Sequence, residues 1–432
     1  MSKKQCEKGL NELAWEKIFA KYDILKQIEA LGCFQISATQ IKPFREPRLM
    51  AKFDHIINLP EIFSAHKLAI LPITRGDYLI SHFDAYHHFE PETTEIVRAS
   101  LPTYIQSLDY GNISSEAMAL NCAVAAGILR DFLEEDEFVP TVSGRMGSGD
   151  FTFDIANSMY GTLNHVTVHN SQIEIDAAYE GIGSLAIFEA KRDVSEDFLV
   201  RQLYYPYRVW SSRVTKPVRP IFLVYSNGVY HLYEYCFQDP NNYSSLVLLK
   251  QKNYSVEDTT ITVADIQSVL YTTEAGAEPA VSFPQADTFS RVINLCELLS
   301  EREYDRNKVT EKYAFDVRQT NYYTDAGRYL GLIHKNEEKR MPSYSLTKLG
   351  KQILQCSFKQ RQLAYCKQIL SHQVFHLTLE KYFENGVMPS KDEIVRIMKQ
   401  CNLYHIGKDS TFGRRASTIR SWVNWMVELI ND

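Results

Sequence analysis

The spacing of apolar and polar positions predicts a chain that begins and ends in helices and is rich in strands between them. Apolar residues recur at helical spacing from Asn11 to Leu31, and Gly32 is a typical stop. Residues 114–136 are apolar on nearly every side after a cap at Ser114 or Ser115, which predicts a buried helix. Residues 219–235 read as two strands joined by a type I′ turn at Asn227-Gly228.

The stretch "QIEIDAAYEGIGSLAIFEAKRD", residues 172–193, predicts a second hairpin with charged tips. The apolar run from Leu185 to Phe188 is typical of a strand buried on both faces. A period of two residues then puts Glu189 and Lys191 on one face of that strand. If the two strands pair through the glycine turn, Asp176 lies beside Glu189.

After this hairpin we expect a helix that begins at a Ser195 N-cap and is bent by Pro206. Helices and strands then alternate, which predicts an α/β core with a mixed central sheet. Towards the C-terminus, residues 287–301, 305–315 and 317–333 form three helical patterns. A basic turn between two short strands and a further helix follow them, and this order predicts a winged helix. A second, weaker unit of the same kind is predicted within residues 390–426.

Length and pattern together predict three domains. A chain of 432 residues is too long for one core. We expect an N-terminal α+β domain over residues 1–105, the α/β core over 106–275, and a mostly helical winged-helix region over 276–432. DNA recognition is one role considered for the first domain, in which Arg45, Arg48 and Lys52 could contact a polyanion; the alternative is an ordinary solvated basic face.

The charge distribution favours a DNA partner at the C-terminal end. The whole chain has a net charge of −6, but residues 334–432 hold 16 Lys/Arg against 9 Asp/Glu. A basic region beside an acidic remainder is consistent with DNA binding. The charged N-terminus lacks the apolar core of a signal peptide, and no apolar run is long enough to span a bilayer. We therefore expect a cytoplasmic protein with no membrane partner.

The eight cysteines show no CxxC spacing that would indicate zinc or redox chemistry, so we interpret most of them as small buried residues. His372 and His376 have the spacing of metal ligands on a helix. No glutamate adjoins them as in a metalloprotease helix, so a structural role is favoured.

The tips of the 172–193 hairpin are the best candidate for chemistry. Two neighbouring carboxylates, Asp176 and Glu189, raise each other's pKa unless a cation joins them, and oxygen ligands of this kind suit Mg²⁺. Lys191 would orient or help deprotonate an attacking water and stabilise charge on phosphorus. The alternative is that these are ordinary charges where strand ends reach solvent.

The pattern Asp-x(12)-Glu-x-Lys on consecutive strands, between a preceding and a following helix, resembles the PD-(D/E)xK nuclease superfamily over residues 114–235. One departure is Ile175, which stands where that motif has proline. The resemblance implies that Asp176 and Glu189 bind the metal and that Lys191 is catalytic.

Two further residues take roles from the same resemblance. Gln202 is on the following helix, where related nucleases carry an active-site glutamine. Glu116 is where some members have an extra acidic residue.

Within that superfamily, "SGRMGSGDFTF", "IFEAKRD" and the C-terminal "YSLTKLG" are similar to type II restriction endonucleases. This resemblance implies Mg²⁺-dependent, sequence-specific cleavage of double-stranded DNA, with a cognate DNA methyltransferase as genetic partner. A palindromic target would favour a homodimer. Two alternatives stay open: a PD-(D/E)xK nuclease of repair or another defence pathway, and a non-catalytic winged-helix regulator.

DNA contacts are predicted outside the catalytic strands. Arg, Gln and Asn read base edges, and basic helix starts bind phosphates. The candidates are Arg318, Gln319, Asn321 and Tyr322 on a recognition helix, Arg414, Arg415, Thr418 and Arg420 further on, and Arg145 in the glycine-rich turn. Tyr323 and Tyr329 are predicted to be core residues.

Overall fold

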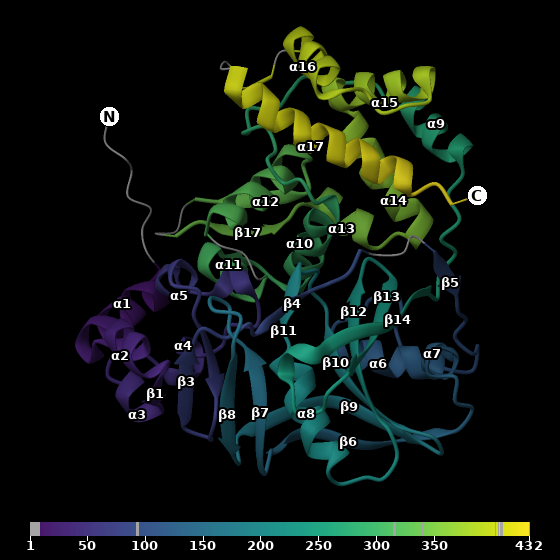
Figure 1. Ribbon diagram of the computed structural model, residues 1–432. Coiled ribbons are helices and arrows are strands. Elements are labelled where there is room, and N and C mark those ends of the chain that lie inside the picture. Colours follow the sequence, from purple (N-terminus) through teal and green to yellow (C-terminus); the bar gives the residue numbers. More distant parts are fainter. Residues whose placement is uncertain are drawn as a thin grey trace.

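In the computed structural model the chain forms an N-terminal unit, a central sheet flanked by helices, and a helical C-terminal region (Figure 1). The structure describes residues 9–91, 95–313, 317–337, 341–401, 403–404, 406 and 409–431. This arrangement confirms the predicted mixed α/β class with a helical C-terminal part. Among the described residues, no helix combines the length and the apolar character needed to cross a bilayer.

The N-terminal unit, residues 10–81, packs helices against a small antiparallel sheet of order β1-β3-β2. Its core gathers Trp15, Phe19 and Phe63 edge to face. The helix predicted over residues 11–31 is interrupted at Asp23, which adopts a left-handed φ of 48°. The elements are α1 (Leu10–Tyr22), α2 (Ile24–Leu31), β1 (Cys33–Ser37), α3 (Ala38–Ile41), α4 (Pro47–Met50), η1 (Ile56–Asn58), α5 (Glu61–Ala65), β2 (Ala69–Pro72) and β3 (Asp77–Ser81).

The central sheet has seven strands in the order β5-β14-β13-β12-β10-β9-β6. β10 runs parallel to β12, and β14 runs parallel to β5, whereas the other pairs are antiparallel, so the sheet is mixed as predicted. The strands are β5 (Ile96–Arg98), β6 (Phe138–Gly147), β9 (Gln172–Gly181), β10 (Leu185–Lys191), β12 (Val218–Ser226), β13 (Val229–Phe237) and β14 (Leu246–Ser255).

Helices cover both faces of this sheet (Figure 1). Leu185 and Ile187 of β10 pack in the same core cluster as α8 (Arg201–Ser211). Ala186, Phe188 and Ala190 pack on the opposite face, with α6 (Glu116–Ala125) and α7 (Ile128–Leu133). This alternation is the period of two expected for a strand buried on both sides, and it assigns Glu189 and Lys191 to the α8 face.

Two short ribbons join the N-terminal unit to the core. β7 (Asp150–Ala156) pairs with β8 (Leu163–His169), and β4 (Tyr86–His88) pairs with β11 (Asp197–Leu199). The prediction that a helix begins at Ser195 was wrong. Asp197–Leu199 pairs as a strand instead, and α8 begins only at Arg201, with Pro206 inside it.

The predicted helix cap and β-turn agree with the structure better than the predicted start of α8 does. Ser115 caps α6 by accepting a hydrogen bond from Met118 N, although Gly127 (φ 74°) divides the expected helix into α6 and α7. Asn227 and Gly228 take positive φ values of 54° and 80°, which a type I′ turn requires.

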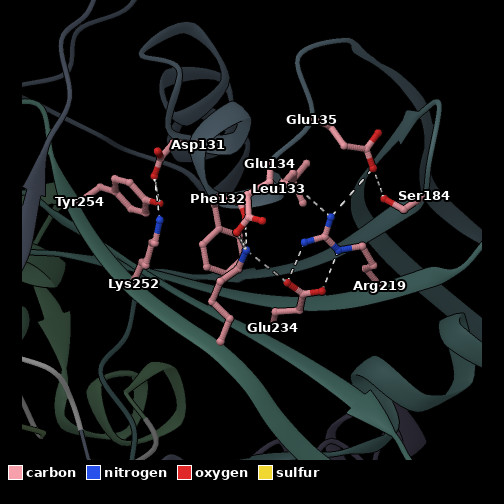
Figure 2. A network of polar contacts seen from close by, with 11 residues as sticks. Asp131, Phe132, Leu133, Glu134, Glu135, Ser184, Arg219, Glu234, Lys252 and Tyr254 are labelled. Carbon is pink, nitrogen blue, oxygen red and sulfur yellow. Dashed lines mark hydrogen bonds and ion pairs between the residues drawn. The ribbon is translucent and has the colours of Figure 1, made fainter.

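A polar network fastens α7 to the sheet (Figure 2). Arg219 of β12 donates to both carboxylate oxygens of Glu234, at 2.7 and 2.8 Å, and to Leu133 O at 2.8 Å. Lys250 donates to Phe132 O at 2.5 Å. Arg219 pairs with Ala186 in the β10–β12 register, so the network lies towards the start of β10, away from Glu189 and Lys191.

The helical C-terminal region, residues 262–431, contains a three-stranded sheet of order β15-β17-β16. Gly350 approaches the backbone so closely that a Cβ there would lie 2.5 Å from Leu332 O. The elements are α9 (Val263–Thr272), α10 (Phe289–Glu301), β15 (Tyr304–Asp305), α11 (Arg306–Lys312), α12 (Val317–Tyr329), β16 (Ile333–Asn336), β17 (Ser343–Leu346), α13 (Lys348–Leu354), α14 (Phe358–Leu370), α15 (Gln373–Asn385), α16 (Lys391–Gln400) and α17 (Asp409–Glu428).

The turn at Asn227 docks this region onto the core. Glu297 of α10 accepts hydrogen bonds from Asn227 N at 2.8 Å and from Ser226 Oγ at 2.7 Å. Arg361 Nε and Gln362 Nε2 of α14 donate to Asn227 Oδ1 at 3.1 and 2.9 Å. Because these side chains are buried or nearly so, the contact fixes the helical region relative to the sheet.

Candidate active site

Asp176 and Glu189 lie opposite each other on adjacent antiparallel strands. The β9–β10 register runs from Glu180 opposite Leu185 to Ala177 opposite Phe188, so the next position brings Asp176 opposite Glu189. Ala190 N donates to Asp176 Oδ2 at 2.7 Å, which holds that carboxylate at the end of β10. The hairpin thus brings together the two carboxylates that are 13 residues apart in the sequence.

Lys191 and Gln202 both contact Glu189. Lys191 Nζ donates to Glu189 Oε1, and Gln202 Nε2 of α8 donates to the same oxygen at 2.7 Å. The Gln202 contact arises because the first turn of α8 faces the end of β10. All four residues named as catalytic from the sequence therefore gather at one point.

Burial and charge shift the protonation of this group. Burial raises the pKa of Glu189 to about 7, Lys191 opposes that rise, and the Asp176 charge adds to it. Burial alone would lower the pKa of Lys191, but the charges of Glu189, Asp176 and Asp54 raise it above its usual value. These charges therefore favour the cationic form of Lys191, while the raised pKa of Glu189 means that a further cation beside it would be stabilising.

The group opens into a cleft of about 430 Å³. One wall carries Asp176, Glu189, Lys191 and Gln202, together with Arg145 of β6. The other wall comes from the N-terminal unit and includes Asp54. The site is therefore built jointly by the N-terminal unit and the core.

The segment that follows Lys191 is held by the helical region. Asn294 of α10, which is 2 % exposed, donates from Nδ2 to Arg192 O and accepts from Val194 N, both at 2.8 Å. Arg192 also reaches Glu301 of α10 at 2.9 Å and Ser114 O at 2.7 Å.

His55 of the N-terminal unit contacts the same segment from another side. Its ring is buried, with Nδ1 2.6 Å from Asp197 O and Nε2 3.6 Å from the Asp193 carboxylate. Burial alone would lower the pKa of His55, but the hydrogen bonds and charges of Asp197 and Asp193 raise it above its usual value. Ile56 N donates to Asp197 Oδ1 at 3.0 Å, so this part of the N-terminal unit is tied to β11.

The donor set suits a magnesium ion that keeps water and phosphate ligands. No other side chain of the described residues bonds the second oxygen of Asp176 or of Glu189. No group of three or more His, Cys, Asp or Glu residues in the described ranges is placed to hold a metal. Mg²⁺ commonly takes one or two carboxylates and fills the rest of its octahedron with water and phosphate oxygens, so two carboxylates fit.

Glu116 lies apart from this group. It is exposed at the first turn of α6 and lines a separate hollow of about 130 Å³ with Arg192, Glu301 and Lys312. The expectation of an extra acidic residue near Asp176 and Glu189 is therefore not met by Glu116, because α6 lies on the face of the sheet opposite α8.

The DNA contacts predicted at Arg145 and on helix α12 differ in how far their side chains are exposed. Arg145 lines the cleft and pairs with Glu174 at 3.1 Å. Arg318 is exposed, whereas Gln319, Asn321 and Tyr322 are partly buried. Tyr323 and Tyr329 are buried in the core, as predicted.

On α17 the structure separates the candidates. Arg414 and Arg420 are exposed. Thr418 is fully buried and donates to Asp287 Oδ1 at 2.5 Å, and Arg415 bonds Gln285 at 2.5 Å. The predicted phosphate contact of Thr418 was wrong, because its hydroxyl fastens α17 to the segment before α10.

His372 and His376 do not share a site. His372 stacks on Tyr329 with 3.9 Å between ring centroids and lies 3.6 Å from Glu278. His376 Nε2 lies 3.0 Å from Leu270 O. Both are packing residues, as the favoured interpretation expected.

Sequence reasoning missed His55, Asn294, Arg75 and Arg201 as parts of this neighbourhood. Their contacts with the cleft or with the 192–197 segment cross between separate units, and no local spacing marks them. Only the charge of Arg75 and Arg201 offered a signal, and many exposed arginines carry the same one.

Three family models match consecutive parts of the chain. Each is described as a domain of unknown function: DUF6996 over residues 12–80, DUF6997 over 81–255 and DUF7226 over 291–431. No curated protein and no solved structure matched the chain. Asp176, Glu189, Lys191 and Gln202 all lie in the second matched part. The segment that follows Lys191 is contacted by all three parts, through His55 of the first, Ser114 of the second and Asn294 of the third.

Proposed function

We propose that the chain is a Mg²⁺-dependent DNA endonuclease of the type II restriction class. One observation carries the proposal: Asp176 and Glu189 face each other at the ends of paired strands, with Lys191 bonded to Glu189 in an open cleft. Structural ion pairs also occur at strand ends. A lysine–carboxylate pair beside a second carboxylate, with shifted pKa values and in a cleft, is more typical of a functional site.

Each residue has a role in this proposal. Asp176 and Glu189 would hold the cation through the oxygens that no described side chain bonds. When bound, Mg²⁺ supplies polarisation of a phosphate oxygen and lowers the pKa of a coordinated water. Lys191 places a fixed positive charge beside the scissile phosphate and orients the attacking water. Gln202 positions Glu189 by donating to Oε1.

The helical region supports a role in sequence recognition. The order α10, α11, α12 and then the β16–β17 hairpin is that of a winged helix, and α12 carries the exposed Arg318. Arg414 and Arg420 add exposed positive charge on α17. Arg is suited to guanine edges and to phosphates, so these three are the preferred DNA contacts.

Membership of the type II restriction class would imply four further properties. They are a cytoplasmic setting, a cognate methyltransferase that protects host DNA, cleavage that leaves 5′-phosphates, and a homodimer where the target is palindromic.

The proposal is tested by incubating plasmid DNA with the protein and Mg²⁺. We expect discrete fragments that are lost with EDTA and with Lys191→Ala. Lys216→Ala is the matched control, because Lys216 contacts Glu180 and Gly181 O at the other end of the same hairpin. A smear without fixed sites would leave a nuclease but remove the restriction class. Intact DNA under all conditions would contradict the proposal.

A further inference from the structure

The wall of the cleft that faces the carboxylates is basic. It is formed by the N-terminal unit, which contributes Arg48 from α4, Lys52 just after α4, and Arg75 from the β2–β3 turn. All three side chains are exposed. They come from separate segments and meet at one cleft, so the concentration of charge is a product of the fold.

Little of this positive charge is neutralised within the protein. Neither Arg48 nor Arg75 forms an ion pair with another described residue, and Lys52 pairs only with Asp54, at 3.5 Å. Exposed arginines are common on protein surfaces. Arginines that have no ion-pair partner and line the same cleft as the two carboxylates are suited to binding a polyanion.

The core adds two more groups of the same sign. Arg145 lines the cleft from β6, and Arg201 lines it from the first turn of α8. Arg201 Nε is buried and forms no hydrogen bond with another described residue. A guanidinium donor without an acceptor in such a cleft is suited to a phosphate oxygen.

The basic wall is rigidly placed relative to the carboxylates. Tyr86 OH donates to Phe53 O at 2.8 Å, and Leu199 N donates to Asp54 O at 2.9 Å. Tyr205 OH of α8 donates to Pro72 O at 3.0 Å, three residues before Arg75. Three hydrogen bonds therefore tie the basic wall directly to β4, β11 and α8, and preformed contacts of this kind preorganise a binding site.

We propose that the N-terminal unit is the phosphate-binding wall of the active-site cleft. Arg48, Lys52 and Arg75 bind the sugar-phosphate backbone of the DNA strand whose scissile phosphate lies at Asp176 and Glu189. This rests on the proposed function and goes beyond it by giving residues 10–81 a direct role in substrate binding. The contacts are sequence-independent, because they are made to phosphates.

The test measures DNA binding separately from cleavage. In a Lys191→Ala background, the affinity for a labelled duplex is measured by fluorescence anisotropy across a range of salt concentrations. The cleft variant combines Arg48→Gln, Lys52→Gln and Arg75→Gln. The control combines Lys17→Gln, Lys26→Gln and Lys42→Gln, three exposed lysines of the same unit that do not line the cleft, with the same change in net charge.

We expect the cleft variant to bind DNA at least about tenfold more weakly than the parent. Its affinity should also depend less on salt: the slope of log affinity against log salt should become shallower by about 3, roughly one for each lost phosphate contact. The control should keep most of the affinity and the slope. Equal binding by the two triple variants would overturn the inference and leave the proposed function standing. A parent that binds no duplex would overturn both. Unchanged melting temperatures would verify that all variants are folded.

Discussion

The side chain of Asn294 is hydrogen-bonded to the main chain of Arg192, one residue after Lys191, at 2.8 Å. The same side chain accepts from Val194 N at 2.8 Å, so both of its polar ends are used on one segment. Asn294 belongs to α10 of the helical region, 103 positions after Lys191 in the sequence. The docking of the helical region therefore helps to fix the end of the strand that carries Lys191.

Replacing Asn294 with alanine is expected to lower the rate of DNA cleavage, because it disturbs the position of Lys191. The substitution removes the two hydrogen bonds to the 192–194 segment, and with them a bond to Glu297 within α10. The freed segment should displace the ammonium group of Lys191, so kcat should fall by about tenfold or more while KM changes little. Ser226→Ala is the control, because it removes a bond to Glu297 at the same interface without touching the segment. Equal kcat values for the two variants would contradict a positioning role for Asn294.

Magnesium binding should weaken in mildly acidic solution. Burial raises the pKa of Glu189 to about 7, so below that pH a proton competes with the cation for the carboxylate. We expect the apparent affinity for Mg²⁺, measured by calorimetry, to fall by up to about tenfold per pH unit below 7 and to level off above it. Glu189→Gln should abolish this dependence. An affinity that is flat from pH 6 to pH 8 would show that Glu189 does not bind the metal.

His55 should stabilise the fold most at low pH. Its pKa is raised in the folded state by Asp197 and Asp193 against the effect of burial, so its protonation favours folding. That contribution is fully present below the unfolded value of about 6.5 and is lost as the pH rises through the higher folded value. The difference in unfolding free energy between the wild type and His55→Asn, from urea titrations, should therefore be larger at pH 5.5 than at pH 8.5. The opposite order would contradict the assigned direction.

Arg219→Met should reduce stability and spare activity. The substitution leaves the buried Glu234 without its two strong donors and exposes Leu133 O, at an expected cost of about 2–3 kcal/mol. The network in Figure 2 lies away from Glu189 on the β10–β12 ladder, so cleavage at a temperature where the variant is folded should match the wild type. A specific loss of kcat without destabilisation would contradict this separation.

The sequence predicted the parts of the structure that depend on neighbours in the chain. The turns at Gly32 and Asn227-Gly228 follow from backbone conformations that few residues adopt, and both were predicted. The face shared by Glu189 and Lys191 follows from the period of a strand. The position of Asp176 beside Glu189 follows from a hairpin too short to allow many registers.

The errors and omissions arise from contacts between distant segments. Ser195 has the chemistry of a helix cap, but the pairing of Asp197–Leu199 with β4 and the bonds of Asp197 to His55 and Ile56 override it. The partners of the 192–197 segment lie more than 75 positions away in either direction. A pattern along one chain carries no information about which surfaces meet. Arg48 and Lys52 could be named as candidate contacts of a polyanion, but their place in one cleft with Asp176 and Glu189 could not be predicted.

The most direct test of the central claim compares the wild type with Asp176→Asn on unmethylated phage DNA in Mg²⁺, with the ends of all products sequenced. We expect ends at a fixed sequence with 5′-phosphates for the wild type, and no cleavage for Asp176→Asn. Intact DNA with the wild type, or equal cleavage by the two proteins, would contradict the assignment of this cleft as a magnesium-dependent nuclease site.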